Sequence, residues 1–232
     1  MFRFKQFEIV DEHCAMKVGT DGVLIGAWAD VVSSRRILDV GAGTALISLM
    51  VAQRSPEARV TAIEIDEAAI VDAQSNVANS PWSERIEVVC GDIRTYQTQR
   101  CFDHIVSNPP YFLNSLHSPD AARTAARHAA TLAYDELIGA AERLLVEGGV
   151  LSVVLPTECA ARFRCEAYGR LWLARLEDVV TCEGEQPKRT LMEFRRVAKP
   201  LMPRCSTMTI YGRGGKYSDE YRLLPEEFYL GF

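Results

Sequence analysis

The sequence contains no apolar run long enough to cross a lipid bilayer. Its longest apolar stretches, around residues 23–29 and 150–155, are far shorter than the roughly 20 residues that a transmembrane helix needs. Residues 1–17 carry charges throughout and lack the continuous apolar segment of a secretory signal peptide. Together these absences predict a cytoplasmic protein with no membrane anchor.

Paired cysteine motifs are also missing. The seven cysteines are an odd number, none of them forms a C-x-x-C pair, and no histidine lies at zinc-finger spacing from them. We therefore expect neither a disulfide framework nor a bound metal. The 232 residues are 48% hydrophobic and 25% charged, an ordinary globular composition, and are numerous enough to bury a core without such cross-links.

The charge is unevenly distributed along the chain. A net charge of -5 does not favour a nucleic-acid partner. Residues 186–222, however, hold nine basic and three acidic side chains, so this stretch is a candidate surface for phosphate groups.

Short apolar runs alternate with amphipathic stretches, which predicts a parallel sheet with helices on both faces. The expected strands are residues 37–40, 59–64, 86–90, 102–107, 149–155, 176–182 and 191–197. The expected helices are 22–31, capped by Thr20 or Asp21, a helix after Gly43, and 67–79, 134–146 and 158–168. The segment between the last two strands has turn composition and no crossover helix, so these strands should form an antiparallel hairpin.

No linker or repeat is apparent, so we expect a single domain over residues 1–232. Residues 1–30 form an N-terminal extension, 31–156 a cofactor-binding and catalytic half, and 157–232 a C-terminal half on the substrate side.

The predicted first strand ends in the glycine turn Asp39-Val40-Gly41-Ala42-Gly43. Glycines let the backbone approach a ligand closely, and the start of the next helix offers unpaired N–H groups. Glu64 ends the second strand, where a carboxylate can accept hydrogen bonds from ribose hydroxyls. A dinucleotide site needs a third glycine where this chain has Leu46. An adenosine-containing ligand without a pyrophosphate therefore fits better than NAD or FAD, and Gly91-Asp92-Ile93 is placed to meet its adenine or ribose.

The sequence Ser-Asn-Pro-Pro-Tyr-Phe, residues 107–112, follows the fourth predicted strand at the end that faces the ligand crevice of such sheets. The two prolines keep the chain extended and stiff. The side-chain oxygen of Asn108 and the carbonyl of Pro109 are both acceptors and can bind the two protons of one amino group. Tyr111 offers an aromatic face to a flat ring. The motif thus suits an exocyclic amine that attacks an electrophile held beside it, by positioning and electrostatics.

The set Asp39-x-Gly41-x-Gly43, Glu64, Gly91-Asp92 and Asn108-Pro109-Pro110-Tyr111 resembles that of S-adenosylmethionine-dependent amino-methyltransferases. The resemblance implies an α/β fold with a Rossmann-like, seven-stranded, mostly parallel sheet, helices on both faces and a C-terminal antiparallel hairpin. It implies S-adenosylmethionine as the cofactor and Asn108, Pro109, Pro110 and Tyr111 as the catalytic residues. The implied cofactor contacts are Asp39, Gly41, Ala42, Gly43, Glu64, Ile65, Asp92, Ile93 and Asn108.

A narrower resemblance begins at the N-terminus. Phe4-Lys5-Gln6-Phe7, residues 14–22 and Ser80-Pro81-Trp82 are similar to the bacterial tRNA (adenine-N6)-methyltransferases that modify the adenosine beside the anticodon of a valine tRNA. This resemblance covers nearly the whole chain and implies a tRNA partner. It also implies that Lys17, Thr20 and Asp21 cover the methionine end of the cofactor. Related enzymes usually carry glycine where this chain has Ala45.

Asn-Pro-Pro-Tyr by itself does not choose between adenine N6, guanine N2, cytosine N4 and a glutamine amide. The alternatives are therefore a protein-glutamine N5-methyltransferase, an rRNA guanine-N2 methyltransferase and a non-catalytic RNA-binding assembly factor. No obligate protein partner is inferred. The candidate RNA contacts are Phe112, Arg123, Arg127, Lys188 and Arg189.

Overall fold

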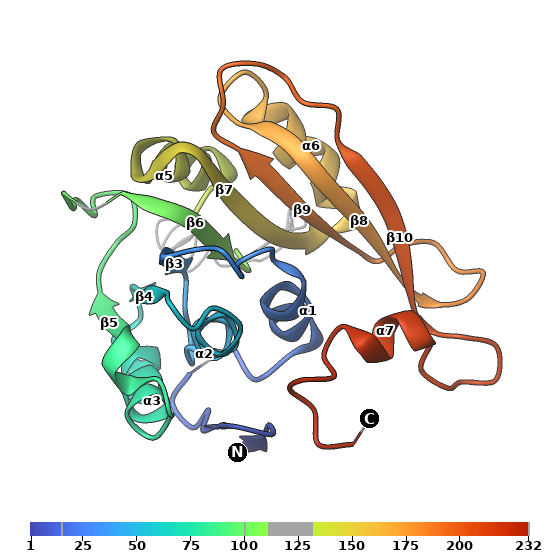
Figure 1. Cartoon of the computed structure of the whole chain (residues 1–232), viewed down its shortest axis with the longest axis horizontal. Helices are drawn as coiled ribbons and strands as arrows, with labels where there is room; N and C mark the ends of the chain where they lie inside the picture. The colour runs from blue at the N-terminus through green and yellow to red at the C-terminus, as the bar shows by residue number, and fades with distance from the viewer. Residues whose placement is uncertain (15, 100, 111–131, 232) are drawn as a thin grey trace, which may run out of the picture.

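An eight-stranded mixed sheet organises the residues that the computed structural model describes, which are 1–14, 16–99, 101–110 and 132–231 (Figure 1). From one edge to the other its strands are β5 (Ile86–Cys90), β4 (Arg59–Glu64), β3 (Arg36–Val40), β6 (Phe102–Ser107), β7 (Leu145–Pro156), β9 (Arg189–Arg195), β8 (Trp172–Cys182) and β10 (Arg204–Tyr211). Within this sheet, β9 alone runs antiparallel to its neighbours. The Rossmann-like arrangement and the antiparallel pairing of β8 with β9 are confirmed.

The expected count of seven strands is wrong, because β10 adds an eighth at the edge, parallel to β8. Its first four residues are exposed, and only Met208 and Ile210 are buried. An edge strand buries little of its surface, so β10 lacks the continuous apolar run that reveals a central parallel strand.

Helices cover both faces of the sheet (Figure 1). On one face lie α1 (Thr20–Trp28), α2 (Leu46–Arg54) and α3 (Glu67–Ala78), whose apolar residues share one core cluster with the sheet. On the other face, α5 (Tyr134–Leu144) and α6 (Thr157–Ala167) belong to a second cluster. Phe163 is fully buried there, with its ring centroid 5.2 Å from that of Tyr134 and 5.4 Å from that of Phe194. Burial of such a ring stabilises the fold by about 2–3 kcal/mol.

The predicted cap of the first helix is wrong. Helix α1 begins at Thr20, its N-cap is Gly19, and no side chain caps it. Thr20 and Asp21 lie inside the first turn instead, and Asp21 forms an ion pair with Arg189. That partner comes from a strand far along the chain, so local sequence cannot indicate it.

Both ends of the described chain lie on the same side of the molecule (Figure 1). A two-stranded ribbon, β1 (Phe2–Arg3) with β2 (Glu8–Ile9), precedes α1, and the short helices η1 (Ser83–Arg85) and α7 (Asp219–Leu223) complete the described elements. The N–H of Lys5 donates to the carbonyl of Phe228 at 2.8 Å, and Phe4 stacks with Tyr229 at 5.8 Å between ring centroids. No helix within the described ranges is long and apolar enough to traverse a membrane.

The order of the strands places the site. The chain builds outward from β3 to β4 and β5, and then returns to the other side of β3 with β6. Crevices for ligands form at the carboxyl ends of strands at such a reversal. Val40 pairs with both Ile63 and Ser107, so the segments that follow β3, β4 and β6 leave the sheet together.

Ala45, just before α2, has the left-handed φ of 63°, and among the described residues it is the one non-glycine with a positive φ. Its methyl group is fully buried. An L-residue in the left-handed region destabilises the folded state by about 1–2 kcal/mol. Glycine avoids this strain, but its greater conformational freedom stabilises the unfolded state by about 0.4–1 kcal/mol. We expect Ala45→Gly to raise the free energy of unfolding by up to about 1 kcal/mol, measured by urea denaturation.

Ala42→Gly in the same turn is the matched control, because Ala42 is also buried but has no positive φ. It should lower the free energy of unfolding by about 0.5–1 kcal/mol. A loss of similar size in both variants would contradict the strain assigned to Ala45.

Candidate active site

The glycine turn after β3 presents bare backbone to the crevice. Gly41 and Gly43 have φ angles of 74° and 54°, which glycine adopts without steric cost. The N–H groups of Gly41 and Ala42 donate to the carbonyl of Ile63 at 3.0 and 3.1 Å, which ties the turn to β4. A Cβ at Gly41 would meet no atom within 4 Å, so that position opens onto free space where a ligand can approach the chain.

Glu64, at the end of β4, is held by three backbone amides. Its Oε2 accepts from Gly43 N at 2.8 Å, and its Oε1 accepts from Ile65 N and Asp66 N at 2.8 and 2.9 Å. A carboxylate offers about four acceptor positions, so Oε2 keeps capacity for one more donor. The carboxylate is therefore fixed in place and still able to accept a hydrogen bond from a hydroxyl group.

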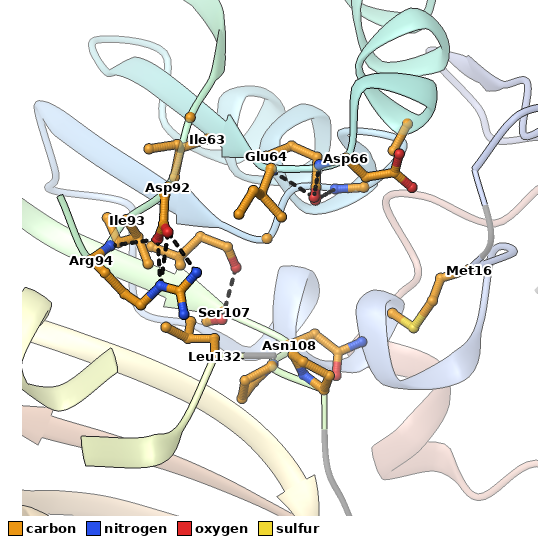
Figure 2. Close-up of a pocket in the computed structure, with 18 of the residues that line it drawn as sticks. Met16, Ile63, Glu64, Asp66, Asp92, Ile93, Arg94, Ser107, Asn108 and Leu132 are labelled. Carbon is orange, nitrogen blue, oxygen red and sulfur yellow. Dashed lines mark hydrogen bonds and ion pairs between the residues drawn. The ribbon is translucent and has the colours of Figure 1, made fainter. Parts of the chain in front are cut away.

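A first cavity of about 230 Å³ lies between the ends of β3, β4, β5 and β6 (Figure 2). Its apolar wall includes Ile63, Ile65, Ile93 and Leu132, while Glu64 and Asp92 supply carboxylates. Figure 2 shows Glu64 and Asn108 on opposite sides of this cavity. A pocket with apolar walls and a few fixed acceptors suits a flat ring joined to a sugar.

Asp92 is organised by Arg94, which sequence reasoning missed. Arg94 Nε lies 2.9 and 2.8 Å from the two carboxylate oxygens of Asp92, and Nη2 lies 2.6 Å from Oδ2 (Figure 2). The hydrogen bonds from Arg94 hold the pKa of Asp92 below its usual range. Both residues line the first cavity. An arginine two positions after an aspartate carries no distinctive sequence signal.

Asn108 and Pro109 follow β6 on the same edge of the sheet. The Ser107 hydroxyl donates to the carbonyl of Val40 at 2.8 Å, which holds the ends of β6 and β3 together. Asn108 is half-buried, Pro109 is buried, and Pro110 is exposed; all three line the first cavity. Four other predicted site residues, Tyr111, Phe112, Arg123 and Arg127, lie outside the described residues.

A second cavity of about 660 Å³ adjoins the first, and Met16, Gly41, Gly43 and Asn108 line both. The second cavity brings together six further residues that the sequence predicted for the cofactor or RNA: Lys17, Thr20, Asp21, Ala42, Lys188 and Arg189.

Two of these residues have protein partners. Arg189 Nε donates to Asp21 Oδ2 at 2.7 Å, which ties β9 to the start of α1. Lys188 lies at the surface, with Nζ 3.2 Å from Glu185. Contact of either residue with RNA stays a prediction.

Asp39 lies beneath the glycine turn and lines neither cavity. Its carboxylate is fully buried; Oδ2 accepts from the Ser48 hydroxyl at 2.6 Å, and Oδ1 has no partner among the described residues. Burial raises the pKa of Asp39 to about 7. Its expected direct contact with the cofactor stays a prediction; in the structure the carboxyl group joins the end of β3 to Ser48 of α2.

Two polar residues of α3 hold the N-terminal segment over the crevice. Asp72 is buried and accepts from the backbone N–H groups of His13 and Cys14, both at 2.8 Å, while its other oxygen lies 2.8 Å from His13 Nδ1. Asn76, also buried, accepts a hydrogen bond from the backbone N–H of Val10 and donates one to its carbonyl, both at 2.8 Å. Burial opposes the charge on Asp72, but these bonds keep its pKa below the ordinary value. The sequence could have indicated this role, because Asp72 and Asn76 are four residues apart and lie on the helix face that carries Ala73 and Val77.

Comparison with known proteins agrees with this geometry. The sequence profile of the family described as "Methyltransferase small domain" matches residues 18–168. A solved structure from Agrobacterium tumefaciens, described as a predicted O-methyltransferase, superposes with a TM-score of 0.70 at 21% identity, covering 90% of this chain and 96% of that one. The fold and the site thus define a methyltransferase.

Relatives that align with nearly the whole chain identify a narrower family within this class. Proteins of Phocaeicola vulgatus and Bacteroides thetaiotaomicron are 49% and 47% identical to it; each alignment covers 99% of this chain and 97% of the relative. Both relatives are named tRNA1(Val) (adenine(37)-N6)-methyltransferase. The chain belongs to this family, which confirms the resemblance found in the sequence.

The buried carboxylate of Asp39 makes stability depend on pH. The folded state binds a proton at a pKa of about 7, against an ordinary value of 3.8, so unfolding releases a proton between these values and stability falls as pH rises through them. Asp39→Asn removes this titration. We expect the free energy of unfolding of the variant, relative to the wild type, to rise between about pH 5 and pH 8 in urea denaturation.

Asp135→Asn, at an exposed carboxylate of α5, is the matched control. A wild-type-to-Asp39→Asn difference that is constant over this pH range would contradict the assignment of a raised pKa to Asp39.

Asp72→Ala should weaken the binding of S-adenosylmethionine by about tenfold, because alanine removes the oxygen that accepts from the N–H groups of His13 and Cys14 and so holds the segment lining the first cavity. Stability should fall by about 1–3 kcal/mol, the cost of buried groups left unpaired. Titration calorimetry and thermal unfolding measure the two effects. Glu67→Ala, a carboxylate truncation at an exposed position of α3, should alter neither. Unchanged affinity in Asp72→Ala would contradict the role of Asp72 in holding the N-terminal segment.

Proposed function

We propose that the protein transfers a methyl group from S-adenosylmethionine to the exocyclic N6 amine of an adenosine in tRNA, specifically the adenosine at position 37 of tRNA1(Val). The observation that carries the proposal is the position of Asn108 at the junction of the two cavities. Two relatives that align over nearly their full length are named for this activity, which supports the choice of substrate.

The first cavity fits the adenosine half of the cofactor. Glu64 keeps one acceptor position for a ribose hydroxyl, and Ile65, Ile93 and Leu132 supply apolar surface for the adenine. The bare backbone at Gly41 allows close approach of the chain to the methionine half. When bound, S-adenosylmethionine supplies an electrophilic methyl group.

Asn108 and Pro109 orient the amine that receives the methyl group. The Asn108 side-chain oxygen and the Pro109 carbonyl each accept a hydrogen bond from one N–H of the amine, which turns the nitrogen and makes its lone pair more available. Because the Ser107 hydroxyl donates a hydrogen bond to the carbonyl of Val40, these acceptors are held at a fixed place on the edge of the sheet. The contribution of the protein is positioning and electrostatic stabilisation.

The alternative substrates are not favoured by the relatives, which are named for adenine rather than guanine or a protein glutamine. A non-catalytic role in RNA assembly is likewise not favoured. A cytoplasmic location and the division of one domain into three parts stay predictions.

Asn108→Ala should lower methyl transfer by on the order of 10²-fold or more, because it removes an acceptor that acts on the reacting amine. The assay follows labelled methyl from S-adenosylmethionine into total tRNA from cells that lack this gene, with nucleosides separated by chromatography. Cofactor affinity, measured by calorimetry, should stay within a fewfold of the wild type.

Asn79→Ala, at the exposed C-cap of α3, is the control and should retain full activity. Label that appears in protein or in another nucleoside instead of N6-methyladenosine would contradict the proposed substrate. Undiminished transfer by Asn108→Ala would contradict the proposed mechanism.

A further inference from the structure

The loop that follows β5 closes one side of the first cavity with Asp92, Ile93 and Arg94. It forms a tight turn, because the carbonyl of Asp92 accepts from Thr95 N at 3.1 Å and from Tyr96 N at 2.8 Å. The side chain of Asp92 is 27% exposed and that of Arg94 is 30% exposed. Both side chains are therefore mostly covered by protein, and each still reaches the wall of the cavity.

Arg94 gives three donors to the Asp92 carboxylate. Its backbone N–H donates to Oδ1 at 2.9 Å. Its guanidinium reaches both oxygens, with Nε 2.9 Å from Oδ1 and 2.8 Å from Oδ2, and Nη2 2.6 Å from Oδ2 (Figure 2). A planar fork of this kind fixes the orientation of a carboxylate as well as its position. Because a carboxylate offers about four acceptor positions, Asp92 keeps capacity for a donor on a ligand in the cavity.

A different arginine holds the backbone of the same loop. Arg143, from α5, donates from Nη2 to the carbonyl of Ile93 at 2.9 Å and to that of Tyr96 at 3.3 Å. Within the part of the chain that the structure describes, the donors to the Asp92 carboxylate all belong to Arg94. The position of the loop and the orientation of the carboxylate thus depend on two separate side chains.

We infer that Arg94 is a positioning residue for cofactor binding, which acts by orienting the Asp92 carboxylate and not by touching the cofactor itself. The inference rests on the proposed function and on the predicted contact of Asp92 with the cofactor. Without the fork, the Asp92 side chain is free to turn toward water, and ordering it again on binding opposes affinity. Asn108 and Pro109 orient the reacting amine, so loss of Arg94 should leave the transfer step itself unchanged.

The test compares the full-length wild type with five variants: Arg94→Ala, Arg94→Lys, Arg143→Ala, Asp92→Ala and the double variant of Asp92→Ala with Arg94→Ala. Titration calorimetry gives the affinity for S-adenosylmethionine. Steady-state assays with tRNA give kcat and the KM for the cofactor, and thermal unfolding gives the stability of each variant.

Arg94→Ala should weaken cofactor binding and raise the KM for the cofactor by about tenfold, the usual effect of losing a hydrogen bond to a charged group. Its kcat at saturating cofactor should match that of the wild type. Arg143→Ala is the matched control: it should lower stability but bind the cofactor as the wild type does. Unchanged affinity in Arg94→Ala would overturn the inference. Equal losses of affinity in Arg94→Ala and Arg143→Ala would also overturn it, because Arg94 would then only brace the loop.

The double variant separates positioning from direct contact. If Arg94 acts through Asp92, its removal from the Asp92→Ala variant should cause no further loss of affinity, because the effects of coupled residues do not add. A second loss of about tenfold, the size expected for an independent hydrogen bond, would mean that Arg94 binds the cofactor directly. That result would overturn the inference.

Arg94→Lys keeps the test decisive if Arg94→Ala does not fold. Lysine retains the positive charge but not the planar fork, so this variant should bind the cofactor less tightly than the wild type and more tightly than Arg94→Ala. Wild-type affinity in Arg94→Lys would overturn the inference. A wild-type protein that binds S-adenosylmethionine but methylates no tRNA would contradict the proposed function alone, since the calorimetric comparison needs no tRNA.

Discussion

The hydrogen bond from Gly43 N to the Glu64 carboxylate, 2.8 Å long, is the contact on which both cavities depend. It joins the turn after β3 to the end of β4, and the bond from Ser107 to Val40 adds the end of β6. These three segments meet because parallel strands end at the same edge of a sheet and the strand order reverses beside β3. The acceptor for a ribose and the acceptors for an amine are thereby fixed relative to each other.

The turn that forms this contact is built against local preference. Ala45 has a left-handed backbone, and the buried Asp39 has no partner for Oδ1 among the residues that the structure describes. Such features persist only where the surrounding structure determines them, and they concentrate at functional sites. Here the core clusters on the two faces of the sheet hold β3 in place.

The segments at both ends of the chain complete the site on either side of this central part. Asp72 and Asn76 hold residues 10–14 beside the cofactor cavity, while β10 and α7 bring Tyr211 and Tyr221 to the second cavity. The bond from Lys5 N to Phe228 O shows that these two additions also contact each other. The part of the chain that the methyltransferase family profile matches, residues 18–168, is in this way flanked at the site by segments that lie outside it.

The sequence by itself determined the parallel sheet, the glycine turn, Glu64 and Asn108, because strand periodicity, glycine and the Asn-Pro-Pro motif act through neighbours in the chain. It also determined the family. Only the tertiary structure decided that Arg94 holds Asp92, that Arg189 pairs with Asp21 rather than standing alone, and that Asp39 lies beneath the turn. It likewise decided the eighth strand, whose edge position requires little apolar surface. These features depend on side chains brought together from distant positions, and a pairing across 168 residues leaves no periodic signal in the sequence.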